Sequence, residues 1–304
     1  MTLTTLMCGG ARRLLTAVVC AFLGSPAAFA GQSAPAAPPA GGQAQSAEAP
    51  YLRDRGPGLP TSMFGTYIRR GELIVYPFYE YYRDHDFEYK PSELGGIGEV
   101  DYRGRFRAHE GLVLISYGLT DNLAFEVEIA AIAASLKKSP DDHSALPDRL
   151  EESGLGDVEG QLRWRWRTET DSRPEVFSYA EIVVPHAKSK PLTGTAGWEL
   201  KFGTGVVRGF RWGTLTARGA IEYAEASSSH FDVGEYALEY VRRLSPKFRI
   251  FAGIEGTQDE LSAIAEAQWH IRPGAIVKLN LGRGLTSKAT DWAPELGILF
   301  TWGR

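Results

Sequence analysis

The chain has 304 residues, of which 43% are apolar and 23% are charged, close to the averages of globular proteins. These fractions exclude a disordered chain and a protein with several membrane-spanning helices, and the formal charge of -4 argues against a nucleic-acid partner. The chain has 34 glycines, 13 tyrosines and 7 tryptophans but only 3 methionines, a balance that favours strands and turns over helix bundles.

The first thirty residues are predicted to be a secretory signal. Arg12 and Arg13 precede an apolar run over 14–24, and Ala28-Phe29-Ala30 offers a small-x-small site, so we expect cleavage after Ala30. The run is too short to span a membrane of about 30 Å. Both cysteines, Cys8 and Cys20, lie in this signal, so the exported chain would contain no disulfide, thiolate metal site or cysteine nucleophile.

Residues 31–50 consist almost entirely of Ala, Pro, Gly, Gln and Ser, a composition typical of a flexible segment. Strand-like patterning begins at Tyr51 and continues to the end of the chain. The predicted organisation is therefore a signal over 1–30, a flexible periplasmic leader over 31–70 and a transmembrane β-barrel over 71–304.

Strict alternation of apolar and polar residues is the main pattern of the barrel region. In 123–129, Leu123, Phe125 and Val127 alternate with Ala124 and Glu126. We count about twelve such segments, at 72–83, 99–118, 123–135, 156–168, 175–186, 197–209, 214–225, 233–244, 248–257, 261–272, 275–285 and 293–302. Short connections alternate with long polar ones, which predicts an all-β, antiparallel, up-and-down barrel with both termini in the periplasm.

A soluble antiparallel sandwich would also alternate, but three features favour a membrane barrel. Aromatic residues gather near strand ends, where interfacial girdles lie, and one face of strand after strand carries charges that suit a hydrated lumen. The chain ends in alternating Leu296, Ile298, Phe300 and Trp302, similar to the C-terminal strand signal of outer-membrane proteins. The expected location is the outer membrane of a Gram-negative-type bacterium. The expected partners are outer-membrane lipid, and the assembly machinery through this last strand.

Three motifs carry a family resemblance: ELIVYPFYE at 72–80, YGLTDNL at 117–123 and GLGDVE at 154–159. They resemble the outer-membrane barrels grouped with the meta-pathway phenol-degradation proteins, over most of residues 70 to 304. The resemblance implies a transporter of small molecules, with aromatic or other hydrophobic compounds among its candidate solutes, and it identifies no substrate.

A membrane-embedded hydrolase is the enzyme alternative. His143-Ser144 with Asp141 and Asp142, or Ser229-His230 with Asp232, supply the residue types of a catalytic triad. Neighbours on an extended chain point in opposite directions, so polar surface loops explain both segments better. No metal-binding His spacing occurs, and the glycines at 154 and 156 lack the continuation of a nucleotide loop. We therefore expect no enzyme, no catalytic or metal site and no cofactor.

The inferred lumen is the candidate site. Arg163, Arg165 and Arg167 recur at spacing two and should form a basic ladder, beside the acidic pair Glu126 and Glu128. The complete set of candidate lumen residues is Glu126, Glu128, Arg163, Arg165, Arg167, Glu181, Lys201, Arg218, Glu222, Glu239, Glu255 and Lys278. A barrel of about twelve strands is intermediate in size between eight-stranded barrels with filled interiors and open porins. Its lumen is therefore compatible with an open polar pathway and with a salt-bridged plug.

The sequence thus predicts a passive channel or transporter for small solutes with a charged lumen, whose outer mouth the loop at 136–155 narrows. The alternatives are a structural or adhesive outer-membrane barrel that binds partners through its loops and, less favoured, the lipid hydrolase.

Overall fold

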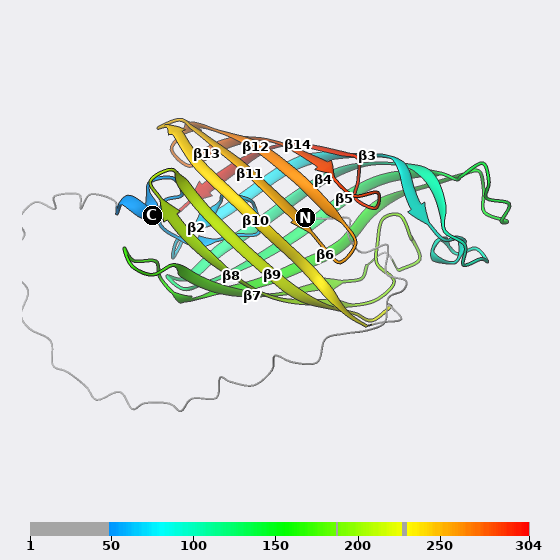
Figure 1. Cartoon of the computed structure of the whole chain (residues 1–304), viewed down its shortest axis with the longest axis horizontal. Coiled ribbons are helices and arrows are strands. Elements are labelled where there is room, and N and C mark those ends of the chain that lie inside the picture. Colours follow the sequence, from blue (N-terminus) through cyan, green and yellow to red (C-terminus); the bar gives the residue numbers. More distant parts are fainter. Residues whose placement is uncertain (1–48, 187, 227–229, 304) are drawn as a thin grey trace, which may run out of the picture.

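The structure, a computed structural model, describes residues 49–186, 188–226 and 230–303. The predicted signal, residues 31–48 of the leader and Ser229 lie outside the described residues. Twelve antiparallel strands close into one barrel (Figure 1), which confirms the predicted fold class and strand number. The strands are β3 (Leu73–Tyr89), β4 (Tyr102–Thr120), β5 (Leu123–Lys137), β6 (Arg149–Arg167), β7 (Glu175–Val184), β8 (Glu199–Phe210), β9 (Gly213–Ala224), β10 (Phe231–Ser245), β11 (Phe248–Gly256), β12 (Leu261–Arg272), β13 (Ala275–Gly284) and β14 (Trp292–Trp302).

The last strand pairs with the first, so the sheet has no open edge and its backbone groups can be satisfied within the barrel. Along this seam Gly297 pairs with Phe78 and Phe300 pairs with Val75, but the two intervening positions of β14 form no pair. The interruption lies at Pro77, which has no N–H to donate. No helix within the described residues is long and apolar enough to cross a membrane.

Alternation along the strands separates an outer apolar face from an inner face. In β4 every second residue from Gly104 to Gly118 is buried, while Val113, Ile115 and Tyr117 between them are exposed on the outside. Exposed tryptophans lie at strand ends around both rims: Trp166, Trp212 and Trp302 at one rim, and Trp198 and Trp292 at the other. Such belts are typical of membrane interfaces.

The two ends of the barrel differ. The turns at one end, here the short-turn end, are as brief as Asp121-Asn122 between β4 and β5, and the chain enters β3 and leaves β14 there. The opposite, long-loop end carries the connections 90–101, 138–148, 185–198 and 285–291. Strands β3 to β6 have 15 to 19 residues and project beyond the other strands at this end (Figure 1). A membrane-spanning strand needs only about 9–11 residues, so these strands extend past the membrane thickness.

Three of the projecting strands extend further than predicted at this end: β3 continues to Tyr89, β5 continues to Lys137, and β6 begins at Arg149 and not near 156. In β3 the alternation of buried and exposed positions ends at Asp84, so a period of two does not reveal the rest of the strand. A separate core fills the projecting end: Tyr89, Phe106 and Leu136 pack with Leu94 and Leu146 of the loops. The loop at 136–155 is therefore shorter than expected, over 138–148, and is anchored by Leu146.

Residues 49–70, here called the plug, occupy the lumen. The prediction of a flexible leader over 31–70 is wrong for this part of the range, because Leu59, Ile68 and Arg55 are almost completely buried. Phe64 packs in a small core with Val241, Phe251 and Ile264, which belong to three different strands of the barrel wall. The physical reason is that the apolar side chains of this short segment can leave water only by entering the barrel.

The plug begins with a short 3₁₀ turn, η1 (Pro50–Leu52), and then folds into a hairpin of β1 (Leu59–Pro60) and β2 (Tyr67–Ile68). The Thr61 N–H donates to the Thr66 carbonyl at 3.0 Å, and the Thr66 N–H to the Met63 carbonyl at 3.1 Å, which closes the turn. Gly58, with φ +135°, has no room for a Cβ because the Ile68 carbonyl oxygen would lie 2.8 Å from it. Ser62 at the hairpin tip contacts Glu126 on the inner face of β5.

Candidate functional site: the lumen

Cavities at opposite ends of the barrel are separated by the plug. The outer cavity, about 650 Å³, lies at the long-loop end between the loops 92–95, 188–196 and 257–260. The inner cavity, about 620 Å³, lies at the short-turn end between the plug and the ends of β11, β12 and β14. Among the described residues the loop 138–148 supplies none of the wall of the outer cavity, so the expectation that this loop narrows the mouth is wrong.

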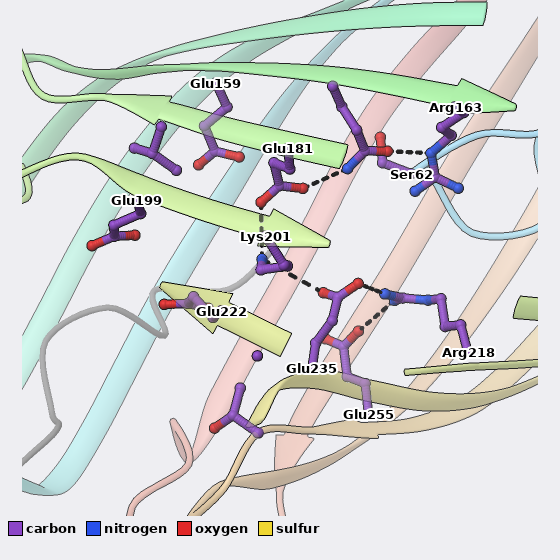
Figure 2. A pocket seen from close by; sticks show the side chains of 14 residues that line it. Ser62, Glu159, Arg163, Glu181, Glu199, Lys201, Arg218, Glu222, Glu235 and Glu255 are labelled. Carbon is purple, nitrogen blue, oxygen red and sulfur yellow. Dashed lines mark hydrogen bonds and ion pairs between the residues drawn. The ribbon is translucent and has the colours of Figure 1, made fainter. Parts of the chain in front are cut away.

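A narrow central cavity of about 50 Å³ connects the outer cavity to the plug tip. Glu199, Glu222 and Thr257 line both cavities, and Ser62 of the plug contributes to the central one (Figure 2). The free space in the barrel thus narrows steeply from the long-loop end toward the plug. The plug tip is the point where passage of a solute is most restricted.

A belt of charged side chains, linked at one point by the neutral Gln161, crosses this narrow region. We call it the charge belt; its members are Glu126, Gln161, Arg163, Glu181, Lys201, Arg218, Glu235, Glu239 and Glu255. At its first end, Glu126 accepts hydrogen bonds from the backbone N–H of Ser62, at 3.0 Å, and from the Ser62 hydroxyl. Arg163 lies next, with Nε 3.6 Å from the Glu126 carboxylate, and also donates to Gln161. The belt therefore binds the plug directly to β5 and β6.

The second half of the charge belt continues around the wall (Figure 2). Lys201 Nζ lies 2.9 Å from Glu181 Oε1 and 3.8 Å from Glu235 Oε2. Arg218 pairs with Glu235, and reaches Glu239 at 2.9 Å through Nε and Glu255 at 3.4 Å through Nη2. One lysine and one arginine thus contact four carboxylates, on strands β7 to β11, and offset half of their charge.

Two glycines of β8 position the belt by making room for aromatic rings. A Cβ at Gly203 would overlap the ring of Tyr179, and a Cβ at Gly205 would overlap that of Phe177. Tyr179 donates from its hydroxyl to Glu235 at 2.6 Å, and the guanidinium of Arg163 lies 5.0 Å from the centre of the Tyr179 ring. The close approach of ring and backbone therefore fixes an anion and a cation of the belt at once.

The opposite wall binds the plug tip through its backbone. The carbonyl oxygen of Phe64 accepts hydrogen bonds from Gln268 Nε2 of β12 and from Lys278 Nζ of β13, both at 3.2 Å. Lys278 also lies 3.2 Å from Glu266 Oε2, and both side chains are about 1% exposed. The tip is thus bonded on one side to β5 and β6 and on the other to β12 and β13.

At the short-turn end the plug is bonded through a buried ion cluster. Arg55 Nη2 lies 3.0 Å from Glu169 and 3.3 Å from Glu175, and all three side chains are at most 1% exposed. Arg165 adds a contact of 3.2 Å to Glu175 and donates to the Gly58 carbonyl at 2.9 Å. Burial is the largest influence on the pKa of Glu169 and raises it, against the opposing effects of the Gly209 N–H and Arg55.

The structure places the predicted lumen residues as follows. Arg163, Glu181, Lys201, Arg218, Glu222 and Glu255 line the central cavity, while Glu126, Arg165 and Lys278 contact the plug and Glu239 contacts Arg218. Glu128 is buried opposite Glu159.

Arg167 is the exception to the predicted basic ladder. The pairing of β6 with β7 shifts by one residue between Arg165 and Arg167, so the alternation that places Arg163 and Arg165 inside does not extend to it. Arg167 is exposed and donates to the Pro174 carbonyl in the adjoining turn. The ladder therefore has two members in the lumen, not three.

Three of the candidate triad residues, Asp142, Ser144 and His230, form other contacts in the described structure. Asp142 accepts from the Tyr89 hydroxyl and from the Ser144 N–H, both at 2.8 Å, which fixes the loop 138–148. His230 contacts the Ala224 carbonyl at 3.3 Å and stacks against Tyr223. Within the described ranges, no group of three or more His, Cys, Asp and Glu residues could hold a metal ion.

The fold and lumen define a class: closed twelve-stranded membrane-type β-barrels with a plugged, charged interior. A solved outer-membrane channel from Pseudomonas putida F1 has a similar structure, with a TM-score of 0.58 and 15% identity over 80% of this chain and 99% of that chain. Weaker similarities are to the translocator domain of the autotransporter NalP from Neisseria meningitidis (TM-score 0.47, 13% identity, 77% of this chain and 89% of that one) and to the toluene transporter TbuX from Ralstonia pickettii (TM-score 0.41, 10% identity, 78% and 90%). No family model and no curated protein matches the sequence. The first similarity shows the fold of an outer-membrane barrel.

Proposed function

We propose that the protein is a passive outer-membrane channel for small solutes, with both termini in the periplasm and the long loops outside. The observation that carries this proposal is the pair of cavities, about 650 and 620 Å³, that open toward opposite ends of one closed barrel. A solid structural barrel needs neither cavity, and its lumen would be filled by side chains. The C-terminal strand, with exposed Leu296, Ile298 and Trp302, would serve assembly in the membrane.

The solute class follows from charge. The central cavity is lined by six carboxylates and three cations, so its field favours small polar solutes with positive charge over anions. The carboxylates are Glu159, Glu181, Glu199, Glu222, Glu235 and Glu255, and the cations are Arg163, Lys201 and Arg218. The resemblance to the meta-pathway barrels keeps aromatic compounds among the candidate solutes. Measuring the uptake of aromatic and of aliphatic cations by proteoliposomes would show which of the two the channel admits.

Conductance tests the proposal directly. We expect the refolded mature chain to give discrete single-channel currents in a planar bilayer, with a reversal potential in a KCl gradient that indicates cation preference. Replacing Glu199 and Glu222 by Gln at the narrow neck should reduce that preference, because the carboxylates that enrich cations there are lost. The exposed Glu151→Gln is the control for the loss of a charge and should leave the selectivity unchanged.

A barrel that gives no current, or that prefers anions, contradicts this proposal. The alternative functions have outcomes of their own in the same preparation. Lipid turnover that disappears in Ser144→Ala would identify a hydrolase, and partner binding that is lost when the loops are shortened would identify an adhesive barrel.

The outer cavity should respond to pH through Glu260, which lines it. Burial raises the pKa of Glu260 to about 7, with Lys288 opposing and Asp259 and Asp84 adding to the rise. This carboxyl is therefore mostly neutral below that pH and negative above it. Cation preference is expected to increase as the pH on the long-loop side passes from about 6 to about 8, and to lose this dependence in Glu260→Gln. An unchanged pH profile in the variant would remove Glu260 as the cause.

A further inference from the structure

The inner cavity has a basic wall that the channel function does not require. Arg55, Arg69, Arg243, Arg249 and His270 line it, while its one carboxylate is Glu72. Glu72 is already paired, since it accepts from Arg69 Nε at 2.7 Å and from the Arg69 N–H at 2.9 Å. Arg55 is paired with Glu169 and Glu175, so the excess positive charge of this cavity comes from Arg243 and Arg249, whereas carboxylates are in excess in the outer and central cavities.

Arg249 is the central feature of this wall. It is 5% exposed, and its Nη1 donates only a long hydrogen bond, 3.4 Å, to the Arg55 carbonyl. Its Nε has no hydrogen-bond partner. Among the described residues no carboxylate lies within ion-pair distance of the Arg249 or Arg243 guanidinium; the charge of Glu266 acts on Arg249 from farther away, and Glu266 is already paired with Lys278. A buried guanidinium without a directly bonded counter-charge is costly, so its retention here calls for an anion.

The groups around Arg249 supply further donors. His270 Nε2 and the Nε and Nη1 atoms of Arg55 are buried and lack partners within the described residues. Arg55 donates to Glu169 and Glu175 through Nη2, so these two carboxylates do not use its Nε and Nη1 donors. The remaining polar groups facing the cavity are the Tyr67 ring, which lies 5.1 Å from the Arg55 guanidinium, and Thr66 and Thr301.

We propose that the inner cavity is a binding site for an oxyanion, the carboxylate or phosphate group of a small molecule that enters from the short-turn end, held by Arg249, Arg243 and His270. Guanidinium groups bind both kinds of oxyanion through paired N–H donors, which matches the unused donors of this wall. The cavity volume of about 620 Å³ lies within the range of ligand pockets, about 300–1,000 Å³. The site does not depend on conduction, because it lies on one side of the plug.

Calorimetric titration of the refolded mature chain in detergent tests the site, with inorganic phosphate and with acetate as separate probes. Sodium chloride at equal ionic strength provides the baseline. We expect saturable binding of at least one probe, an at least tenfold loss of affinity in Arg249→Gln and in Arg243→Gln, and only partial recovery in Arg249→Lys, which keeps the charge but lacks the paired N–H donors. Because Arg243 is only half-buried, Arg243→Gln is the variant that should disturb folding least.

The matched control is Arg272→Gln, which removes an exposed arginine near the same rim. Binding of phosphate alone assigns a phosphate-bearing ligand, and binding of acetate assigns a carboxylate. No saturable heat with either probe overturns the proposal, and so does an equal loss of affinity in Arg272→Gln, which would indicate only a general attraction of anions to a basic rim.

Discussion

Deleting residues 51–66 is expected to raise the single-channel conductance several-fold. This deletion removes the plug tip, including Ser62 and Phe64, whose bonds reach both sides of the lumen. The outer and inner cavities would then join into one hydrated pathway, since no other described segment crosses the lumen between them. The measurement is the conductance of single channels in a planar bilayer.

The control deletes an equally long part of the leader, residues 31–46, which leaves the plug and its contacts in place. This variant should conduct like the full mature chain. Heat-modifiable migration of both deletion variants establishes that the barrel has folded. If the variant without the plug folds and its conductance equals that of the control, the plug is not the barrier and the restriction must lie in the charge belt.

Replacing Arg218 by Gln is expected to lower the free energy of unfolding by about 3 kcal/mol or more, the range found when one partner of a buried ion pair is removed. Arg218 is 8% exposed and contacts Glu235, Glu239 and Glu255, which are 13–17% exposed. Without Arg218 these carboxylates would repel one another in a space that admits little water. Urea unfolding, followed through loss of the heat-modifiable form, measures the change.

Two further variants separate charge from packing in this experiment. Arg218→Lys keeps the charge and should recover part of the stability, although it cannot reach all three carboxylates at once. Adding Glu235→Gln to Arg218→Gln removes one of the unpaired charges and should also restore stability, as expected for residues that interact directly. The exposed Arg107→Gln on the outer face of β4 is the control. Equal effects at positions 218 and 107 would contradict the structural role of the belt.

The lumen residues could be predicted only as far as alternation extends. Spacing alone predicts Glu126, Arg163 and Lys201 on the inner face, because a strand fixes the direction of every second side chain. The same rule failed at Arg167, where a single register shift relative to β7 ends the alternation. A shift of this kind depends on how two strands pair, which spacing within one strand does not reveal.

The pairing of charges also depended on strands that are distant in the sequence. Arg218 meets Glu255 across 37 residues, and Ser62 meets Glu126 across 64. The free donors around Arg249 line a cavity that the closed sheet and the plug enclose together, so no single segment of the sequence indicates it. The predicted set therefore named belt members without their partners and did not include the basic inner cavity.

The sequence by itself determined the barrel: twelve alternating segments, an apolar outer face and a charged inner face follow from a period of two that any strand must obey. Only the tertiary structure decided what fills the barrel. The sequence does not show what the apolar residues of 51–70 pack against. They are buried because the closed wall provides an enclosed surface to pack against. The plug, and with it the division of the lumen into an acidic outer cavity and a basic inner one, is therefore a consequence of closure.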